Sequence, residues 1–292
     1  MAGTVTWRAA SLNGIVHCVE VHRYGMFRPR MAMLHRVPWD PGFIGRSPGL
    51  WPIARAAERL RGCAVWPTLA EFDALYLAEA DACGVPRLRF RYDAHPRRSR
   101  STQPIVHEDL YDGSISLLGQ VPTRPENWHD LLNALCFATW PRSKVALHAR
   151  QYRLLAQRLT SDAVRLPPAR LPAQDALTLF DEGGVLIAAD RPAAQALRAC
   201  LAAPLTDTLI PLIREQRAHV VPFGHALFEH MVEGITCPGA TARIIAFDTL
   251  PPRGTALLHA LDQALADKLG DPQQFLMPSK GRHLRLEDLA AP

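Results

Sequence analysis

The stretch Ala176-Leu-Thr-Leu-Phe-Asp-Glu-Gly-Gly-Val-Leu-Ile-Ala-Ala-Asp190 is the clearest local fold signal in the sequence. Two apolar runs flank Asp-Glu-Gly-Gly, and glycine beside an acidic residue is typical of a tight turn between antiparallel strands. We therefore expect a β-hairpin over these residues. Because aspartate is a common helix N-cap, Asp190 also predicts a helix directly after the hairpin, to about Ala202.

Other strands and helices are predicted on both sides of this stretch. Alternating polar and apolar residues predict strands at 88–92, 111–119 and 241–248. Apolar spacing and breakers predict helices at 53–61, 68–83, 127–140, 143–159, 208–217, 224–232 and 255–268. Thr68 and Glu71 stand in capping-box spacing at the start of the second helix. The expected class is α+β, predominantly helical, with a mixed or antiparallel sheet of about five strands that includes the hairpin.

The chain is expected to divide into three segments. Residues 1–84 form an N-terminal helical and irregular segment packed on the core, because residues 1–47 hold aromatic residues and proline without a clear period. Residues 85–270 form the main α+β domain. Residues 271–292 form a C-terminal tail, which we expect to be an extended end.

The composition bounds the class of protein. Of 292 residues, 48% are hydrophobic and 21% are charged, as in proteins with a buried core. No apolar run approaches the ~20 residues that a bilayer-crossing helix needs. The first residues lack a basic start followed by an apolar stretch, so no secretory signal is predicted. We therefore expect no membrane association and a cytoplasmic location.

The positive net charge raises nucleic acid as a partner. The chain carries a net charge of +5 at neutral pH, but arginine supplies most of its basic residues. The one local basic run contains Arg97, Arg98 and Arg100 and has no aromatic residue that would stack on bases. A solvated loop is the favoured interpretation, and nucleic-acid binding stays the alternative.

Several familiar catalytic motifs are missing. The sequence has no G-x-G-x-x-G or Walker loop for a nucleotide and no G-x-S-x-G nucleophile elbow. Its six cysteines include no C-x-x-C pair, so we expect them to be reduced, small buried side chains. Histidines and carboxylates are the remaining candidates for chemistry.

One predicted helix carries a polar stripe that becomes aromatic along its length. At about 100° per residue, Asn133 lies about 40° from His129, Glu126 about 60° and Asp130 about 100°. Trp140 falls within the same arc. A polar end with an apolar floor is typical of a ligand pocket, so we take Glu126 and Trp140 as pocket residues.

Helix capping explains only part of this stripe. Asn127 suits an N-cap, and Asp130 then lies at the third helical position, where its carboxylate meets free N–H groups. Capping does not explain His129, or Asn133, which is a poor helix former in mid-helix. A histidine near a helix N-terminus tends to be neutral, which suits a base or a metal ligand. The candidate catalytic residues are therefore His129, Asp130 and Asn133.

A family resemblance begins in the same region. The run Pro122-Thr-Arg-Pro-Glu-Asn-Trp-His-Asp-Leu-Leu-Asn-Ala-Leu, followed by Trp140-Pro-Arg-Ser-Lys-Val-Ala-Leu, resembles the signature of the bacterial domain-of-unknown-function 3025 family. The blocks Leu88-Arg-Phe, Leu179-Phe-Asp-Glu-Gly-Gly and Phe223-Gly-His-Ala-Leu-Phe-Glu are similar to other parts of it. The family pattern usually has Phe and Asn where this chain has Trp140 and His148, so a role for position 148 is not expected. The resemblance implies a soluble bacterial protein and carries over no catalytic residues.

Two further groups can extend the predicted site. His225 and Glu229 are one turn apart on a predicted helix, where a carboxylate can fix an imidazole tautomer; a surface ion pair is the alternative. Asp181 and Glu182 stand in the predicted turn, which needs no function but can supply oxygen ligands to the pocket. A divalent metal bound by His129, His225 and Glu229 is the resulting cofactor hypothesis.

Hydrolysis of a small-molecule substrate, with or without that metal, is the leading functional hypothesis. His129 would activate water beside the carboxylates, and it should then lie near His225. The alternative is a non-catalytic ligand- or nucleic-acid-binding protein, and a third interpretation gives the polar residues only capping roles. The sequence specifies neither the substrate nor the oligomeric state.

Overall fold

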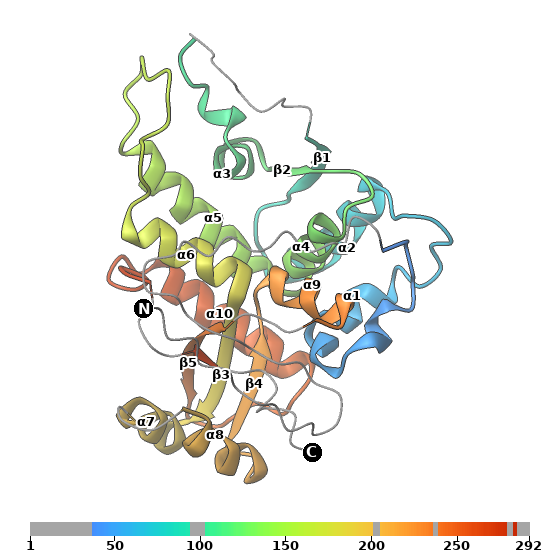
Figure 1. Cartoon of the computed structure of the whole chain (residues 1–292), viewed down its shortest axis with the longest axis vertical. Coiled ribbons are helices and arrows are strands. Elements are labelled where there is room, and N and C mark those ends of the chain that lie inside the picture. The colour runs from blue at the N-terminus through green and yellow to red at the C-terminus, as the bar shows by residue number, and fades with distance from the viewer. Residues whose placement is uncertain (1–36, 94–102, 201–204, 236–238, 279–282, 285–292) are drawn as a thin grey trace, which may run out of the picture. The chain divides into compact units, whose positions relative to one another are not determined.

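The computed structural model describes residues 37–93, 103–200, 205–235, 239–278 and 283–284 (Figure 1). The chain divides into two compact units, each built from separated parts of the sequence. Of the described residues, those within 37–55, 180–261 and 283–284 form the sheet unit, and those within 56–179 and 262–278 form the helical unit. The predicted division after residues 84 and 270 stays a prediction.

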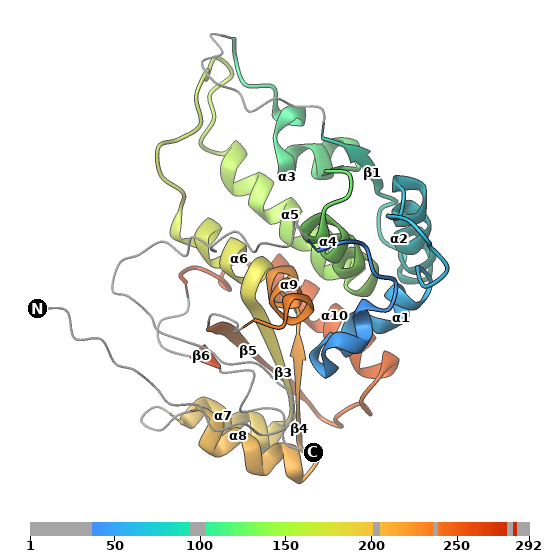
Figure 2. The ribbon, with the colours of Figure 1, turned by 45° about the vertical axis from the view of Figure 1, so that its right-hand side comes forward.

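A four-stranded mixed sheet forms the centre of the sheet unit, in the order β4-β3-β5-β6. The strands are β3 (Gly184–Asp190), β4 (Ala218–Pro222), β5 (Ala240–Phe247) and β6 (His283–Leu284). β3 runs antiparallel to β4 and parallel to β5, and Ile187 lies opposite Val220 on one side and Ile244 on the other. Every residue of β3 from Gly184 to Ala189 is buried, so this strand forms part of the core (Figure 2).

Helices complete the sheet unit. They are α7 (Arg191–Ala199), α8 (Leu205–Arg214) and α9 (His225–Glu233), with the 3₁₀ turns η2 (Phe43–Arg46) and η3 (Pro48–Ile53). The carboxylate of Asp190 accepts the backbone N–H of Ala193 at 2.7 Å, which confirms the predicted N-cap of α7. Figure 2 shows α7 and α8 side by side beyond the end of β3.

The predicted β-hairpin is wrong. Helix α6 (Pro172–Gly183) occupies the place of the first arm, and β3 begins directly after it. A short apolar run fits a strand and a buried helix face equally well, and Ala176, Leu177 and Phe180 are buried at helical spacing. At Gly184 a Cβ atom would lie 2.3 Å from the carbonyl oxygen of Phe180, so the change from helix to strand requires glycine here.

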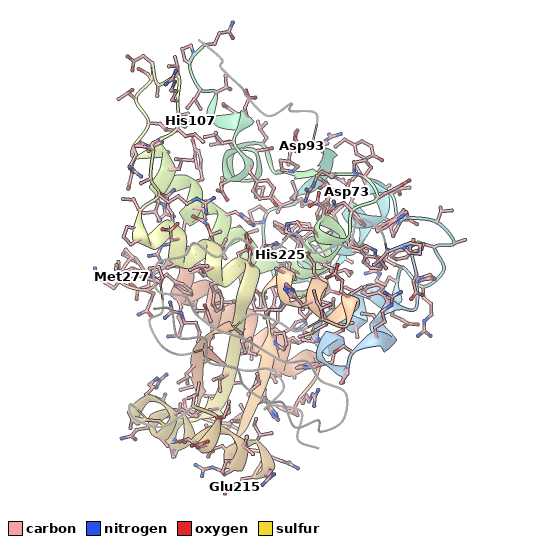
Figure 3. All side chains as sticks on the ribbon, in the orientation of Figure 1. Asp73, Asp93, His107, Glu215, His225 and Met277 are labelled. Atoms are coloured by element: carbon pink, nitrogen blue, oxygen red, sulfur yellow. The ribbon has the colours of Figure 1, made fainter. Side chains whose placement is uncertain are left out.

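The helical unit packs its helices beside a small parallel sheet. Its elements include α2 (Leu69–Cys83), α4 (Trp128–Thr139), α5 (Pro141–Ala156), and the strands β1 (Arg89–Tyr92) and β2 (Gln120–Thr123). The predicted capping box is confirmed, because Glu71 accepts the backbone N–H of Thr68 at 2.6 Å and the Thr68 hydroxyl accepts that of Glu71. Asp73, labelled in Figure 3, joins α2 to β1 by accepting the backbone N–H of Phe90 at 2.7 Å.

A second strand prediction is also wrong. Residues 111–118, expected to be extended, form the helical turn α3 (Tyr111–Gly113) and the single-turn π-helix η5 (Ser114–Leu118). The alternation that suggested a strand does not follow burial, because Ile115 is buried while Leu117 and Leu118 are about half exposed. β2 begins only after Gly119, whose φ of 63° ends the helical turn.

Two buried charged side chains hold helix α10 (Thr255–Gly270) against α5 within the helical unit. The Asp262 carboxylate accepts the backbone N–H groups of Arg142 and Ser143 at the start of α5. The Arg150 guanidinium of α5 donates to four carbonyl oxygens at the C-terminal end of α10 and directly after it, those of Leu269, Asp271, Pro272 and Gln274. The Ser143 hydroxyl donates to the Asp262 carbonyl oxygen at 2.9 Å.

The α+β class with a mixed sheet is confirmed, with strands in two separate sheets. In the part of the chain that the structure describes, no helix is long and apolar enough to cross a membrane. The arginine-rich run at 95–102, residues 1–36 of the N-terminal segment and most of the predicted tail after residue 278 lie outside the described residues.

Candidate functional site

Helix α4 begins at the predicted N-cap, Asn127, but the carboxylate of Asp130 binds the preceding loop instead of the helix N-terminus. The Asn127 side chain accepts the backbone N–H of Asp130 at 3.2 Å. The Asp130 carboxylate accepts the backbone N–H of Arg124 at 2.6 Å and two guanidinium N–H groups at 2.8 and 3.0 Å, so it closes the preceding loop. Glu126 is exposed and precedes the helix with a φ of 50°, so helical spacing does not place it. His129, the second residue of α4, is half-buried.

The next turns of α4 carry predicted and unpredicted site residues. The Asn133 amide nitrogen donates to the Tyr111 hydroxyl at 3.0 Å. The Tyr111 ring lies edge-on to His148, with 5.6 Å between the ring centroids, and His148 stacks on Phe137 at 5.3 Å. Nδ1 of His148 lies 2.9 Å from an oxygen of Asp112. We call the group Tyr111, Asp112, Asn133, Phe137, Lys144 and His148 the dyad cluster.

Three neighbouring elements build the dyad cluster. The turn α3 supplies Tyr111 and Asp112 and packs against α5. Asn133 and Phe137 are one turn apart on α4, as are Lys144 and His148 on α5, so each pair shares a helix face. The α3 turn is held close by Gly113, where a Cβ atom would lie 1.8 Å from the carbonyl oxygen of His107. The cluster therefore depends on a backbone approach that only glycine permits.

Two polar atoms of the dyad cluster have no partner. His148 and Asn133 are 2% and 7% exposed, respectively. Nε2 of His148 and Oδ1 of Asn133 are buried and accept or donate no hydrogen bond within the described part of the protein. A buried polar group left without a partner costs about 1–3 kcal/mol, so such atoms are uncommon in folded proteins. When Asp112 accepts the Nδ1–H group of the neutral imidazole, Nε2 carries a lone pair, and both unpaired atoms are then acceptors.

A buried cation completes the dyad cluster. Lys144 is 1% exposed, and its ammonium lies 4.7 Å from the centroid of the Phe137 ring. Attraction between a desolvated ammonium and an aromatic face is worth up to about 2 kcal/mol. Trp140, predicted as the pocket floor, is fully buried at the junction of α4 and α5, one turn before Lys144.

The sequence prediction missed Tyr111, Asp112 and His148. The first two lie in residues predicted as a strand, which would have separated their side chains onto opposite faces. No role was expected for His148 because the family pattern usually has Asn at that position; in the structure its Nδ1 lies 2.9 Å from Asp112. The available signal was Lys144 and His148 at one-turn spacing, facing the polar stripe of the preceding helix.

The remaining predicted site residues lie in the sheet unit. His225 is the first residue of α9 (Figure 3), and its Nδ1 lies 3.8 Å from an oxygen of Asp181 at the end of α6; both side chains are largely buried. Glu229 is buried one turn later on α9. The carbonyl oxygen of Glu182 faces Gly224, where a Cβ atom would lie 2.3 Å from it. Asp181 and His225 are therefore brought together, although not by a hairpin turn.

The predicted metal site is not supported by a cluster of ligands. Among the residues placed in the structure, no group of three or more His, Cys, Asp and Glu side chains is arranged to hold a metal ion. His129 belongs to the helical unit, and His225 and Glu229 belong to the sheet unit. The predicted proximity of His129 and His225 stays a prediction.

A comparison with protein-family models matches residues 100–285 to the family described as "Protein of unknown function (DUF3025)". The match includes every member of the dyad cluster and the Asp181–His225 pair. The comparisons with curated proteins and with solved structures each found no match.

Proposed function

The chain belongs to the DUF3025 family, as the sequence resemblance predicted, and for this member we propose hydrolysis catalysed by the Asp112–His148 pair. The observation that carries the proposal is the orientation of His148. One ring nitrogen faces a carboxylate at 2.9 Å, and the other is a buried acceptor without a partner. A histidine oriented by a carboxylate, with its second nitrogen available for a proton, is the arrangement of a general base.

The reaction follows from this arrangement. Nε2 of His148 would take a proton from a water molecule as the water oxygen attacks the electrophilic centre of the substrate. The proton would pass to the leaving group as its bond breaks, which returns His148 to the neutral form. Asp112 would remain ionised, hold Nδ1–H in place and stabilise the imidazolium that forms. Oδ1 of Asn133 would accept a donor group of the substrate and hold its leaving group beside Nε2.

This proposal changes the base that the sequence suggested. The hydrolase hypothesis named His129, and the supporting geometry belongs to His148, with Asn133 common to both. His129 and Asp130 precede Asn133 on the same helix by about one turn, so a role for His129 in binding substrate stays a proposal.

The test compares paired variants on a panel of simple substrates: an ester, an amide and a phosphomonoester of p-nitrophenol or p-nitroaniline. His148→Asn and Asp112→Asn should each lower kcat by about 100-fold or more, because general-base catalysis is worth roughly 10²–10⁴ in rate. His148→Asn also places in this chain the residue that the family pattern usually has there.

The control is a second histidine that contacts a tyrosine. Nδ1 of His107 lies 2.8 Å from the Tyr152 hydroxyl, and the two ring centroids are 5.8 Å apart in an edge-to-face arrangement. Tyr152 follows His148 by one turn on α5. His107 is labelled in Figure 3. His107→Asn should leave the rate within about twofold of the wild type. Equal loss in both histidine variants, or full activity in His148→Asn, would exclude His148 as the base.

The metal-assisted form of hydrolysis, with His129, His225 and Glu229 as ligands, has a separate test. If these residues bind a divalent ion, metal analysis of the purified protein would find about one equivalent, and His129→Ala would remove it. Equal metal content in wild type and variant would remove His129 from this proposal without affecting the role of His148.

A further inference from the structure

We infer that the dyad cluster binds an uncharged primary carboxamide through its N–H groups, so that the substrate class is an amide. The inference deepens the proposed function, because it uses the same His148, but it concerns recognition and can be tested without turnover. It rests on the unpaired atoms Oδ1 of Asn133 and Nε2 of His148, which belong to side chains at least nine-tenths buried.

Both unpaired atoms are acceptors, and this decides which ligand groups fit. Asn133 has already placed its amide nitrogen against the Tyr111 hydroxyl at 3.0 Å, so its oxygen is the atom left over. His148 directs Nδ1 to Asp112, which leaves Nε2 with a lone pair in the neutral imidazole. A carboxamide NH₂ group offers two N–H donors to such acceptors, whereas a carboxylate or phosphate offers only further acceptors and would leave them unsatisfied.

The charges of the dyad cluster favour a neutral ligand. The carboxylate of Asp112 and the ammonium of Lys144 carry opposite charges, so the cluster is neutral as a whole when the imidazole is neutral. Lys144 lies against Phe137, the same ring on which His148 stacks. A ligand with a net charge would lose its hydration here without a net opposite charge to offset that cost. A neutral amide loses less hydration free energy than an ion when it is buried.

Tyr111 fixes the orientation of the Asn133 side-chain amide. Its hydroxyl accepts from the amide nitrogen, and its ring edge covers His148 at 5.6 Å. Tyr111 is 40% exposed, in contrast to the buried Asn133 and His148, so a ligand would approach from solvent beside this ring. Tyr111 is therefore a positioning residue. Without its hydroxyl, the Asn133 amide can rotate by half a turn and offer N–H in place of oxygen.

The experiment is an NMR titration of the full chain, labelled with ¹⁵N, with acetamide, acetate and methylammonium at equal ionic strength. Signals of the Asn133 side-chain amide and the His148 imidazole are assigned through Asn133→Leu and His148→Asn. Acetamide should shift both signals saturably, and acetate should shift neither. Tyr111→Phe and Asn133→Leu should each weaken acetamide binding by about fivefold or more, which corresponds to the loss of one hydrogen bond.

Tyr152→Phe is the matched control, because it removes the other tyrosine hydroxyl that contacts a histidine in this region. It should leave acetamide binding unchanged. Saturable shifts with acetate but not acetamide would show a donor facing the site and overturn the inference, as would tighter binding of methylammonium or no saturable binding of acetamide. If Asn133→Leu does not fold, Tyr111→Phe provides the same comparison with Asn133 in place.

The two proposals fail in different ways. Acetamide binding without hydrolysis of any panel substrate would remove the catalytic proposal and leave amide recognition standing. Hydrolysis that depends on His148 without acetamide binding would overturn only the inference about the substrate class.

Discussion

The carboxylate of Asp112 lies 2.9 Å from Nδ1 of His148, although the two residues are 36 positions apart and belong to α3 and α5. The backbone of the α3 turn places Asp112 for this contact. Gly113 follows Asp112 directly and lies against the carbonyl oxygen of His107, which holds the turn in place. The turn therefore controls the distance between the acid and the base.

Gly113→Ala should destabilise the protein and disturb the contact between Asp112 and His148. The backbone at Gly113 is in the ordinary right-handed helical region, so conformational strain is not the reason. The added Cβ would lie 1.8 Å from a backbone oxygen, and the turn would have to move. We expect the free energy of unfolding in urea to fall by about 1–3 kcal/mol, as for overpacking in general.

Gly62→Ala is the control for this change, because a Cβ atom at Gly62 meets no atom within 4 Å. It should leave the urea midpoint nearly unchanged. If the α3 turn positions Asp112 against His148, Gly113→Ala should also lower kcat in any assay that responds to His148→Asn. Wild-type stability and activity in Gly113→Ala would show that the turn accommodates a side chain.

Arg150→Lys should destabilise the helical unit. The guanidinium of Arg150 is largely buried and donates to four carbonyl oxygens around the end of α10. A lysine ammonium has three donors on a single atom and cannot reproduce this planar fork. Loss of charged hydrogen bonds to buried carbonyls should lower the free energy of unfolding by about 2–4 kcal/mol.

Arg158→Lys is the comparison for that variant. Arg158 donates to the single carbonyl of Ala169 at 2.7 Å on the surface. Its replacement should change the free energy of unfolding by less than about 0.5 kcal/mol, as for most surface positions. Equal effects of the two replacements would argue that the carbonyls around Arg150 find water instead.

The buried carboxyl of Asp262 should stabilise the folded protein at low pH and lose this effect as pH rises, which is the opposite of the usual carboxylate contribution. Burial raises the pKa of this carboxyl above its ordinary value, and the hydrogen bonds from Ser143 and Arg142 oppose the shift only in part. The folded state therefore binds the proton more tightly than the unfolded state. The resulting stabilisation is fully present below the unfolded pKa of about 4 and is lost as pH rises through the raised pKa.

Urea denaturation at a series of pH values checks this sign. The free energy of unfolding of the wild type, minus that of Asp262→Asn, should decrease as pH rises above about 4 and become constant above the folded-state pKa. Asp190 gives the opposite case, because its hydrogen bonds with Arg217 and with the backbone of Ala193 lower its pKa. The difference between wild type and Asp190→Asn should decrease as pH falls. Parallel slopes for the two variants would contradict the assignment.

Gly224→Ala should disrupt the sheet unit at the start of α9. A Cβ atom at this position would lie 2.3 Å from the carbonyl oxygen of Glu182 and 2.6 Å from the backbone nitrogen of Gly183. Because backbone atoms cannot rotate away, we expect a loss of about 1–3 kcal/mol or more in urea denaturation. Gly183→Ala, whose Cβ would meet no atom within 4 Å, should be nearly neutral. A stable Gly224→Ala would show that α9 can move away from Glu182.

Several local features of the fold could be predicted from the sequence because their physical cause is local. Asn127, Asp190 and the Thr68–Glu71 pair begin helices by binding N–H groups three residues away. Such contacts need no knowledge of the rest of the chain. The polar stripe of α4 also led to Asn133, since helical spacing alone places it on a face with Phe137 and Trp140.

The two strand predictions failed where a pattern had two solutions. Short apolar runs around 111–119 and 176–183 fit the period of a strand or a buried helix face, and the surrounding structure selects between them. The helix was selected at Phe180 because that side chain is fully buried at helical spacing with Ala176 and Leu177. At Leu117 and Leu118 burial did not follow the alternation at all.

By itself, the sequence determined the family, the α+β class, the starts of α2, α4 and α7, and the face that carries Asn133. The helix starts and this face depend on contacts within one or two turns. Only the tertiary structure decided the partners. It brought Asp112 to His148 through a turn that passes His107 too closely for any residue but glycine at position 113. It also left Oδ1 of Asn133 unpaired by giving its amide nitrogen to Tyr111. Long-range pairing of this kind depends on packing between segments, which no local period encodes.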